Sequence, residues 1–381
     1  MKLVFFGLSV TSTWGNGHGT TYRALLQALR VRGHEIVFFE KDVEWYASNR
    51  DLPDPGFCKV RLYDHWSAVR PRVRKELRDA DVAVVGSYFP DGIAAIDEML
   101  DSGVPVKTFY DIDTPITVSA LRERGAADYL AQRQIALLDI YFSFTGGPML
   151  REIEARFGAS RAVPLYCSFD PHRYRRRRSN SNLACDLSYM GTYAPDRQPK
   201  LQELLCGPAL QLASRRFIVA GPQYPSAIAW PKNVRRIEHL SPIWHPDFYS
   251  SSRFTLNVTR RDMVMAGYSP SVRLFEAAAC GAAIISDNWP GLDGFFRPAE
   301  EILVPNGPED VMHFLSDLTD DEVLRLGHGA QARVLEEHTS AHRAQQFERA
   351  VENLPKIPQR DTEDRPLCRG GQPVQAIPDQ A

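Results

Sequence analysis

Three groups of residues in the 381-residue sequence have types and spacings that suggest chemistry. They are a glycine-rich loop at residues 15–19, two aspartates within residues 111–115, and a serine, an arginine and a glutamate within residues 269–281. A general base, a carboxylate pair and an anion-binding helix are the corresponding chemistries. Whether they form one site depends on the strands and helices that carry them.

The glycine-rich loop follows a buried strand at Lys2–Phe6 and precedes a helix predicted to begin near Thr20. Glycine lets the backbone approach a ligand, and a helix N-terminus offers free N–H groups. We therefore expect Gly17 to contact an acceptor or a sugar. His18 could be a general base, because imidazole titrates near neutral pH. A loop histidine that is merely hydrogen-bonded to its neighbours is an equally good interpretation.

The same glycines allow a rival interpretation as a dinucleotide-binding fingerprint. That motif needs GxGxxG directly after the strand and an acidic residue about 20 residues further on. Glu40 stands at the end of the next predicted strand. The spacing is GxGxG, however, and the loop from Leu8 to Trp14 separates the glycines from the strand. NAD binding is therefore the less favoured alternative.

Asp111 and Asp113 follow the predicted strand Val104–Tyr110. Because the carboxyl ends of parallel strands face the ligand crevice, we expect Asp113 to be catalytic and Asp111 to bind the acceptor or sugar. Two alternatives stay open. The pair could hold a divalent cation against a diphosphate. Asp113 or Thr114 could also simply cap the helix that begins near Ile116.

The segment Ser269–Gly281 is the most informative stretch. Its opening serine is a good N-cap and Pro270 suits the first helical position, which predicts a helix that begins there. The first turns carry Ser271 and Arg273, which suit a diphosphate. Glu276 follows on the same face, where a carboxylate could accept both ribose hydroxyls. A surface ion pair between Arg273 and Glu276 is the plain alternative.

Strand and helix patterns alternate through two halves of the chain, which predicts parallel sheets covered by helices on both faces. The first half runs to residue 172 and the second from 183 to 337. Between them Arg175–Asn182 is a basic, polar run, either a solvated linker or a phosphate-binding patch. A helix at 338–354 closes the fold. We expect the tail, residues 355–381, to be disordered because it is rich in proline and polar residues.

The composition limits the class of protein. Hydrophobic residues at 44% and charged residues at 24% are ordinary for a globular chain. A net charge of −2 indicates no nucleic-acid partner. The six cysteines form no CxxC pair and no zinc spacing, so we expect reduced thiols. No long apolar window is present, so we expect a cytoplasmic protein without an integral membrane segment. Peripheral association with a membrane is compatible with this sequence.

The second half resembles the nucleotide-binding half of GT-B glycosyltransferases of the group 1 type, and more narrowly their spore-maturation-protein-like branch. The segments that carry the resemblance are Asp186–Tyr193, Leu256–Arg260, Ser269–Gly281 and His338–Arg343. The first half is similar more loosely, through its glycine-rich loop and Asp111–Pro115. The resemblance implies an α/β GT-B fold, in which two Rossmann-like domains face each other across a cleft. Residues 1–172 would bind the acceptor, 183–337 the nucleotide sugar, and 338–354 would cross back.

The resemblance also implies roles for particular residues. The helix glutamate of the family contacts the nucleotide ribose, and small and basic residues face the diphosphate. The implied nucleotide-sugar contacts in this sequence are Gly191, Thr192, Arg197, Ser271, Arg273 and Glu276. One departure stands out. Many members carry a second glutamate near the donor sugar, whereas Tyr268 stands eight positions before Glu276 and no acidic residue lies close to it.

The activity that the resemblance implies is glycosyl transfer from a nucleotide-diphosphate sugar to an acceptor hydroxyl, as in polysaccharide or glycoconjugate biosynthesis. The donor would be a UDP-sugar, the enzyme a hexosyltransferase, and the acceptor a glycan, a glycoconjugate or a protein. We expect no metal and no cofactor, because arginines and helix N–H groups can neutralise the leaving diphosphate. The alternatives are a nucleotide-sugar epimerase on the same fold and a non-catalytic sugar-nucleotide-binding module. Only the missing acidic residue before Ser269 favours the latter.

Overall fold

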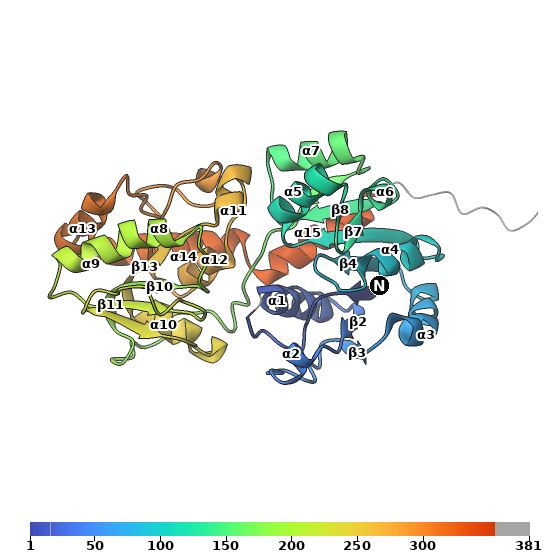
Figure 1. Cartoon of the computed structure of the whole chain (residues 1–381), viewed down its shortest axis with the longest axis horizontal. Coiled ribbons are helices and arrows are strands. Elements are labelled where there is room, and N and C mark those ends of the chain that lie inside the picture. Colours follow the sequence, from blue (N-terminus) through green and yellow to red (C-terminus); the bar gives the residue numbers. More distant parts are fainter. Residues whose placement is uncertain (16, 355–381) are drawn as a thin grey trace, which may run out of the picture.

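Buried runs of branched and aromatic residues become the strands of two parallel sheets, one in each of two lobes (Figure 1). The computed structural model describes residues 1–15 and 17–354. The expected disordered tail, residues 355–381, lies outside the described residues. We call the half that carries the first sheet the first lobe and the other half the second lobe. None of the described helices is long and apolar enough to cross a membrane.

The sheet of the first lobe has seven parallel strands in the order β3-β2-β1-β4-β5-β8-β9. Its strands are β1 (Lys2–Phe6), β2 (Glu35–Lys41), β3 (Lys59–Tyr63), β4 (Val82–Gly86), β5 (Val106–Asp111), β8 (Ile140–Ser143) and β9 (Ala162–Pro164). The chain leaves β1 toward one side of the sheet and returns to the other side at β4. In a parallel sheet, such a reversal of strand order opens a crevice at the carboxyl ends of the strands.

Helices cover both faces of this sheet because the interior strand β1 is apolar on both faces. Val4 and Phe6 pack into one core cluster, and Leu3 and Phe5 pack into another. The helices are α1 (Gly17–Val31), α2 (Glu44–Ala47), α3 (Trp66–Arg78), α4 (Gly92–Leu100), α5 (Thr114–Arg124), α6 (Gln132–Ile135) and α7 (Pro148–Phe157). A small antiparallel pair, β6 (Ala126–Ala127) and β7 (Leu130–Ala131), follows α5.

The sheet of the second lobe has five parallel strands in the order β12-β11-β10-β13-β14. They are β10 (Cys185–Met190), β11 (Phe217–Ala220), β12 (Val234–Ile237), β13 (Ser252–Asn257) and β14 (Ala283–Ser286). The helical elements are α8 (Gln198–Leu201), η1 (Gln202–Cys206), α9 (Gly207–Gln211), η2 (Pro242–Trp244), α10 (His245–Ser251), α11 (Arg261–Ala266), α12 (Val272–Ala279), η3 (Leu292–Gly294), α13 (Pro308–Asp317) and α14 (Asp320–Glu337).

The last helix, α15 (Ser340–Glu352), returns to the first lobe and packs against α1 (Figure 1). Phe347 stacks on Phe142 with ring centroids 5.1 Å apart. Arg343 is only 1% exposed and donates hydrogen bonds to the carbonyls of Tyr166 and Cys167 at 3.1 and 3.3 Å. The chain therefore crosses between the lobes twice, and these two crossings contact each other.

Candidate functional site

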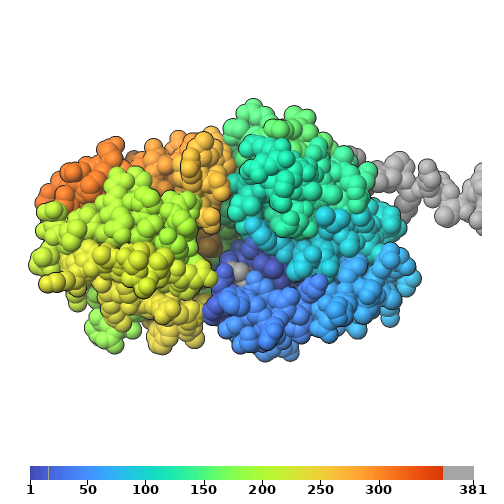
Figure 2. Space-filling model, in the orientation of Figure 1, coloured from blue at the N-terminus to red at the C-terminus, as the bar shows by residue number. Residues whose placement is uncertain are grey.

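A cleft of about 390 Å³ opens between the lobes, where the carboxyl ends of the two sheets face each other. Figure 2 shows the hollow between the two halves of the surface. Gly17 and Thr20 of α1 line it from the first lobe. From the second lobe it is lined by five of the residues singled out in the sequence: Gly191, Thr192, Arg197, Arg273 and Glu276. Segments far apart in the sequence thus come together at one place.

Two arginines give one wall of the cleft a positive charge. Arg273 donates to Asn257 Oδ1 at 2.9 Å, and its guanidinium lies 5.2 Å from the ring centre of Tyr189. Arg197 donates to the Thr192 carbonyl. Burial lowers the pKa of Arg197, and the neighbouring positive charge of Arg273 acts in the same direction. Neither arginine has a carboxylate within ion-pair distance among the described residues, so this wall suits a bound anion.

The helix that carries Arg273 begins later than the sequence predicts. Its first residue is Val272, and Ser271, rather than Ser269, occupies the N-cap position. The Ser271 hydroxyl does not cap the helix, because it donates to Asn257 Oδ1 at 3.2 Å. The first N–H groups of α12 are therefore left without a side-chain cap beside the two arginines. Such a helix start adds partial positive charge to the anion-binding wall.

Glycine is required where this wall turns. A Cβ atom on Gly191 would lie 2.8 Å from the Arg273 guanidinium. Gly221 has a φ of +143°, and a Cβ atom there would lie 2.0 Å from the Gly191 carbonyl oxygen. Any side chain at either position would displace the backbone or the arginine. The two glycines therefore let the Arg273 guanidinium and the two backbone turns pack closely together at this wall.

Glu276 is a buried acid on the same helix. It is 5% exposed, and burial raises its pKa to about 7 although hydrogen bonding with Tyr174 opposes the shift. No ion pair joins Glu276 to Arg273 within the described residues, so the surface ion pair considered from the sequence does not form. Glu276 instead presents hydrogen-bond acceptors to the cleft. That arrangement suits a ligand with neighbouring hydroxyl groups.

In the first lobe, His18 directly follows Gly17, which lines the cleft, and His18 pairs with Asp113. His18 Nε2 lies 2.7 Å from Asp113 Oδ2, and the Ser87 hydroxyl donates to the same oxygen at 3.2 Å. His18 is not a loop residue, because α1 begins at Gly17 and includes it, and it is 7% exposed. Its Nδ1 has no hydrogen-bond partner among the described residues. A histidine oriented by a carboxylate can accept a proton at its other nitrogen.

Asp111 does not reach the cleft, which corrects the expectation that it binds an acceptor or a sugar. The residue is completely buried and accepts hydrogen bonds from the Tyr141 hydroxyl at 2.5 Å and the Thr117 hydroxyl at 2.7 Å. Burial raises its pKa to about 7. It also accepts the backbone N–H of Asp113 at 3.2 Å. Asp111 therefore orients Asp113, and it cannot share a cation with Asp113 while these partners occupy it.

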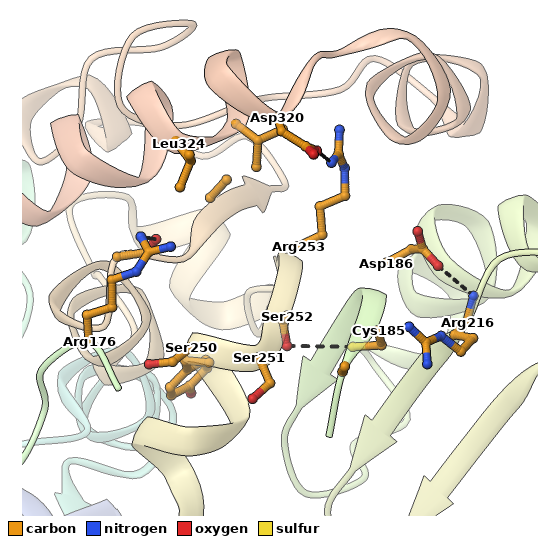
Figure 3. Close-up of a pocket in the computed structure, with 15 residues that line it drawn as sticks. Arg176, Cys185, Asp186, Arg216, Ser250, Ser251, Ser252, Arg253, Asp320 and Leu324 are labelled. Atoms are coloured by element: carbon orange, nitrogen blue, oxygen red, sulfur yellow. Dashed lines mark hydrogen bonds and ion pairs between the residues drawn. The ribbon is translucent and has the colours of Figure 1, made fainter. Parts of the chain in front are cut away.

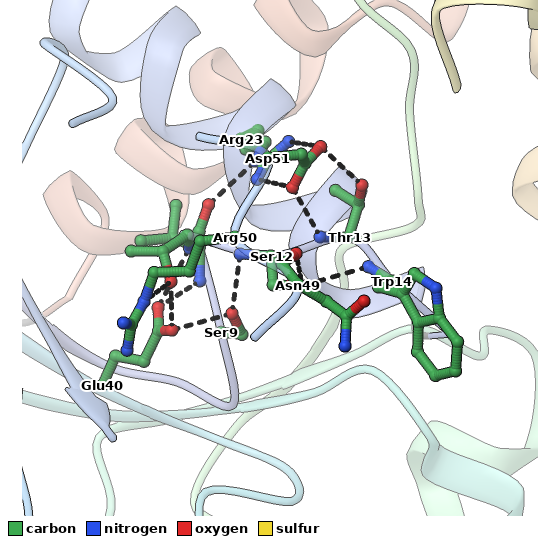
Figure 4. Close-up of polar contacts among 11 residues, drawn as sticks. Ser9, Ser12, Thr13, Trp14, Arg23, Glu40, Asn49, Arg50 and Asp51 are labelled. Atoms are coloured by element: carbon green, nitrogen blue, oxygen red, sulfur yellow. Dashed lines mark hydrogen bonds and ion pairs between the residues drawn. The ribbon is translucent and has the colours of Figure 1, made fainter. Parts of the chain in front are cut away.

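Glu40 is the acidic residue of the dinucleotide interpretation. Its carboxylate is hydrogen-bonded to the loop after β1 (Figure 4). It is completely buried and accepts hydrogen bonds from the Ser9 hydroxyl at 2.9 Å, the Val10 N–H at 2.6 Å, and both the N–H and the hydroxyl of Thr11. No oxygen of this carboxylate is left for a ribose. Glu40 is therefore unavailable to a ribose, and the interpretation as an NAD-binding motif loses its acidic residue.

The basic run Arg175–Asn182 lies on the opposite end of the second sheet. Arg176 lines a pocket of about 450 Å³ at the amino ends of β10 and β13 (Figure 3). Its guanidinium donates to the Gly281 carbonyl at 3.4 Å, and Arg177 pairs with Asp247 at 3.1 Å. The four arginines of the run are exposed. None of them lines the cleft, and Arg177 lines a separate pocket that it shares with Thr20 and Arg23 of α1.

Sequence analysis did not identify three residues at the site, which are Ser87, Tyr174 and His245. Ser87 follows a buried strand, as Asp111 does, so the same strand-end argument could have found it. Tyr174 and His245 belong to no motif, and only the fold brings them beside Glu276 and the cleft. Among the described residues, no group of three histidine, cysteine, aspartate or glutamate side chains is arranged to hold a metal ion.

Comparisons with known proteins agree with this architecture. Residues 197–349 match the family model described as "Glycosyl transferase-like". No curated protein sequence matches the chain. The structure is similar to sucrose-phosphate synthase from Thermosynechococcus elongatus, with 12% identity, a TM-score of 0.65, and coverage of 93% of this chain and 98% of that chain.

Two further structures are similar over almost their whole length. HepE of Anabaena in complex with UDP-glucose has 11% identity and a TM-score of 0.64, with coverage of 93% and 100%. An alpha-glucosyltransferase in complex with UDP has 11% identity and a TM-score of 0.66, with coverage of 92% and 100%. The predicted GT-B fold and the resemblance to GT-B glycosyltransferases are confirmed. The spore-maturation-protein-like branch stays a prediction.

The buried carboxyl of Asp111 generates a prediction on pH and stability. Its pKa is raised in the folded protein, so the neutral form is the one that folding favours. This contribution is complete below the unfolded pKa near 3.9 and is lost as the pH rises through about 7. Asp111→Asn, which stays neutral, should therefore gain stability relative to the wild type between pH 5 and 8, by roughly 1–3 kcal/mol. Urea unfolding at both pH values measures this.

The matched control is Asp64→Asn, at an exposed aspartate in the same lobe. Its stability difference from the wild type should not change between the two pH values. Equal pH dependence of Asp111→Asn and the wild type would show that Asp111 is ionised in the folded protein at neutral pH.

Proposed function

We propose that this GT-B chain is a glycosyltransferase that moves a hexose from a UDP-sugar to an acceptor hydroxyl without a metal ion. The observation that carries the proposal is the pairing of His18 with Asp113 at 2.7 Å, directly after Gly17, which lines the cleft together with Arg197 and Arg273 of the second lobe. One wall then suits a nucleotide diphosphate and the other suits proton removal from an acceptor. A non-catalytic module would not need a histidine oriented by a carboxylate.

The second lobe would bind the donor. Glu276, when ionised, would accept the two ribose hydroxyls. Arg197, Arg273 and the uncapped start of α12 would surround the diphosphate. Because two guanidinium groups and a helix N-terminus supply positive charge, the leaving group is neutralised without a metal ion. The similar structures that hold UDP or UDP-glucose support uridine as the nucleoside.

The first lobe would bind the acceptor, a glycan, a glycoconjugate or a protein. The acceptor oxygen attacks the anomeric carbon while His18 takes its proton, and the bond from that carbon to the diphosphate oxygen breaks. Asp113 stabilises the imidazolium that forms and is itself fixed by Ser87 and by Asp111. His18 Nδ1 is screened from solvent, so the acceptor reaches it only when the side chains around it rearrange. His18 of the first lobe therefore takes up the proton, whereas the diphosphate departs from the second lobe.

The donor assignment predicts the effect of Glu276→Gln on UDP binding. The variant should bind UDP about 30-fold more weakly at pH 8, because an ionised acceptor for the ribose hydroxyls is worth about 2 kcal/mol. Isothermal titration calorimetry with UDP in the presence of EDTA measures the change. Glu336→Gln, at an exposed glutamate of α14, is the control and should bind UDP as the wild type does. Unchanged affinity in Glu276→Gln would remove the ribose assignment.

The acceptor assignment predicts that substitutions of His18 and Asp113 lower the rate of sugar transfer without weakening UDP binding. His18→Ala should lower kcat about 100-fold or more, and Asp113→Asn about tenfold or more, because general base catalysis contributes about 10²–10⁴-fold. UDP affinity should stay within about twofold, since neither residue lies on the donor wall. The assay follows UDP release from UDP-glucose with a panel of sugar acceptors. His328→Ala, at an exposed histidine of α14, is the control. Transfer at the wild-type rate by His18→Ala would contradict the base assignment.

A further inference from the structure

The turn after β4 carries a tyrosine in a backbone conformation that tyrosine rarely adopts. Tyr88 has a φ of +58°, in the left-handed region where the Cβ atom of a side chain crowds the backbone. The residue lies two positions after the end of β4 and is 41% exposed. Glycine would adopt this conformation without strain, and strain of this kind gathers at functional sites.

The residues on both sides of Tyr88 hold it in this conformation. Ser87 donates its backbone N–H to the Tyr110 carbonyl at 3.0 Å and its hydroxyl to Asp113 Oδ2 at 3.2 Å. Phe89, on the other side, is completely buried in a core cluster. Tyr88 therefore cannot relax unless the turn breaks the contact with Asp113 or pulls Phe89 from the core.

The Tyr88 ring lies against His18. The two ring centroids are 5.8 Å apart, and the ring planes are almost perpendicular, at 87°. Tyr129 contacts the same tyrosine ring, with centroids 4.9 Å apart. Tyr129 is only 5% exposed, and its hydroxyl is hydrogen-bonded to Thr117, which donates to Asp111 at 2.7 Å. The exposed ring is therefore held beside the histidine by a buried network.

The topology of the first sheet places both rings at its ligand side. Strands β1 and β4 are neighbours, and the strand order reverses between them. His18 lies in the helix that follows β1, and Tyr88 lies in the turn that follows β4. Ligands of open parallel sheets bind outside the carboxyl ends of the strands at such a reversal. A ligand in this crevice therefore meets an exposed aromatic ring next to a histidine.

The pair suits a ligand that combines an apolar face with hydroxyl groups. The face of an aromatic ring carries partial negative charge and attracts C–H groups, which carry partial positive charge. A pyranose ring presents C–H groups on its face and hydroxyl groups around its rim. Because the two ring planes are almost perpendicular, a sugar that lies on Tyr88 turns its rim toward His18. A serine or threonine side chain has a hydroxyl group but no flat face to stack.

We propose that Tyr88 is an acceptor-binding residue on which the sugar ring of the acceptor stacks, with one hydroxyl group directed at His18. The inference rests on the proposed function and narrows its acceptor, from a glycan, a glycoconjugate or a protein, to a sugar ring. The strained backbone of Tyr88 is then the cost of keeping an aromatic ring beside the histidine.

The first experiment measures UDP release from UDP-glucose with methyl glycosides and disaccharides as acceptors. Tyr88→Ala and Tyr88→Gly should each raise the acceptor KM about tenfold and change kcat less than about threefold, because stacking is a binding interaction. Tyr88→Phe keeps the ring and should recover most of that loss. Leu137→Ala, at another exposed apolar side chain of the first lobe, is the control and should keep the wild-type KM.

Thermal stability separates the effect of the ring from that of the backbone. Tyr88→Gly relieves the strain, whereas Tyr88→Ala retains it, so the glycine variant should have a Tm about 2 °C or more above that of the alanine variant. Both variants lack the ring, so their acceptor KM should be equal although their stabilities differ. If Tyr88 had a purely structural role, the acceptor KM would instead follow Tm.

An acceptor KM in Tyr88→Gly within about twofold of the wild type would overturn the proposal, as would transfer to a serine-containing peptide but to no sugar. Absence of UDP release with every acceptor would instead contradict the proposed function, so the two failures are distinguishable. The second experiment tests the Tyr88 site without any transfer. Protein labelled with fluorotyrosine is titrated with the same sugars and with the peptide, and the ¹⁹F signal of Tyr88 is assigned through Tyr88→Phe.

The Tyr88 signal should shift with at least one of the sugars and stay in place with the peptide. The signals of the buried tyrosines Tyr110 and Tyr141 are the internal control and should not move. A Tyr88 signal that no sugar shifts, or that only the peptide shifts, would contradict the proposal.

Discussion

The buried guanidinium of Arg343 holds together the two places where the chain crosses between the lobes. It donates to the carbonyls of Tyr166 and Cys167 on the first crossing, and to the Glu337 carbonyl and His338 Nδ1 ahead of the second. No carboxylate among the described residues pairs with it, so backbone carbonyl dipoles balance the charge. Burial lowers its pKa. Together with the hydrogen bond from the Thr145 hydroxyl to Ser269 at 3.0 Å, these contacts fix how the two walls of the cleft face each other.

The fixed cleft divides the chemistry between the lobes. The second lobe provides two arginines that have no ion-pair partner among the described residues, and a buried acid, Glu276, all of which line the cleft. The first lobe provides a histidine whose orientation depends on Asp113 and, behind it, on Asp111. Each wall is built at the carboxyl ends of parallel strands, where backbone groups and helix starts are free to meet a ligand.

The sequence predicted the parts of this site that obey strand-end and helix-start rules. The residue pattern and the resemblance singled out Arg273 and Glu276, which line the cleft, although their helix begins at Val272 and not at the predicted Pro270. The strand β3 was not predicted, because Lys59 and Arg61 interrupt its apolar pattern at the edge of the sheet. The expectation that Asp111 binds an acceptor or a sugar was wrong, because a sequence pattern gives the position of a residue in a strand but not the side chains that surround it. Tyr174 and His245 could not be found, because only tertiary packing brings them to Glu276.

The most direct test of the central claim is a thermal-shift panel with UDP, GDP, ADP, CMP and NAD, each with and without Mn²⁺. A ligand at about 100 times its dissociation constant adds roughly 2.7 kcal/mol of stability, which raises Tm by several degrees in a chain of this size. The account predicts a shift with UDP that is the same without Mn²⁺, and no shift with NAD. A shift with NAD alone, or a UDP shift that requires Mn²⁺, would contradict it.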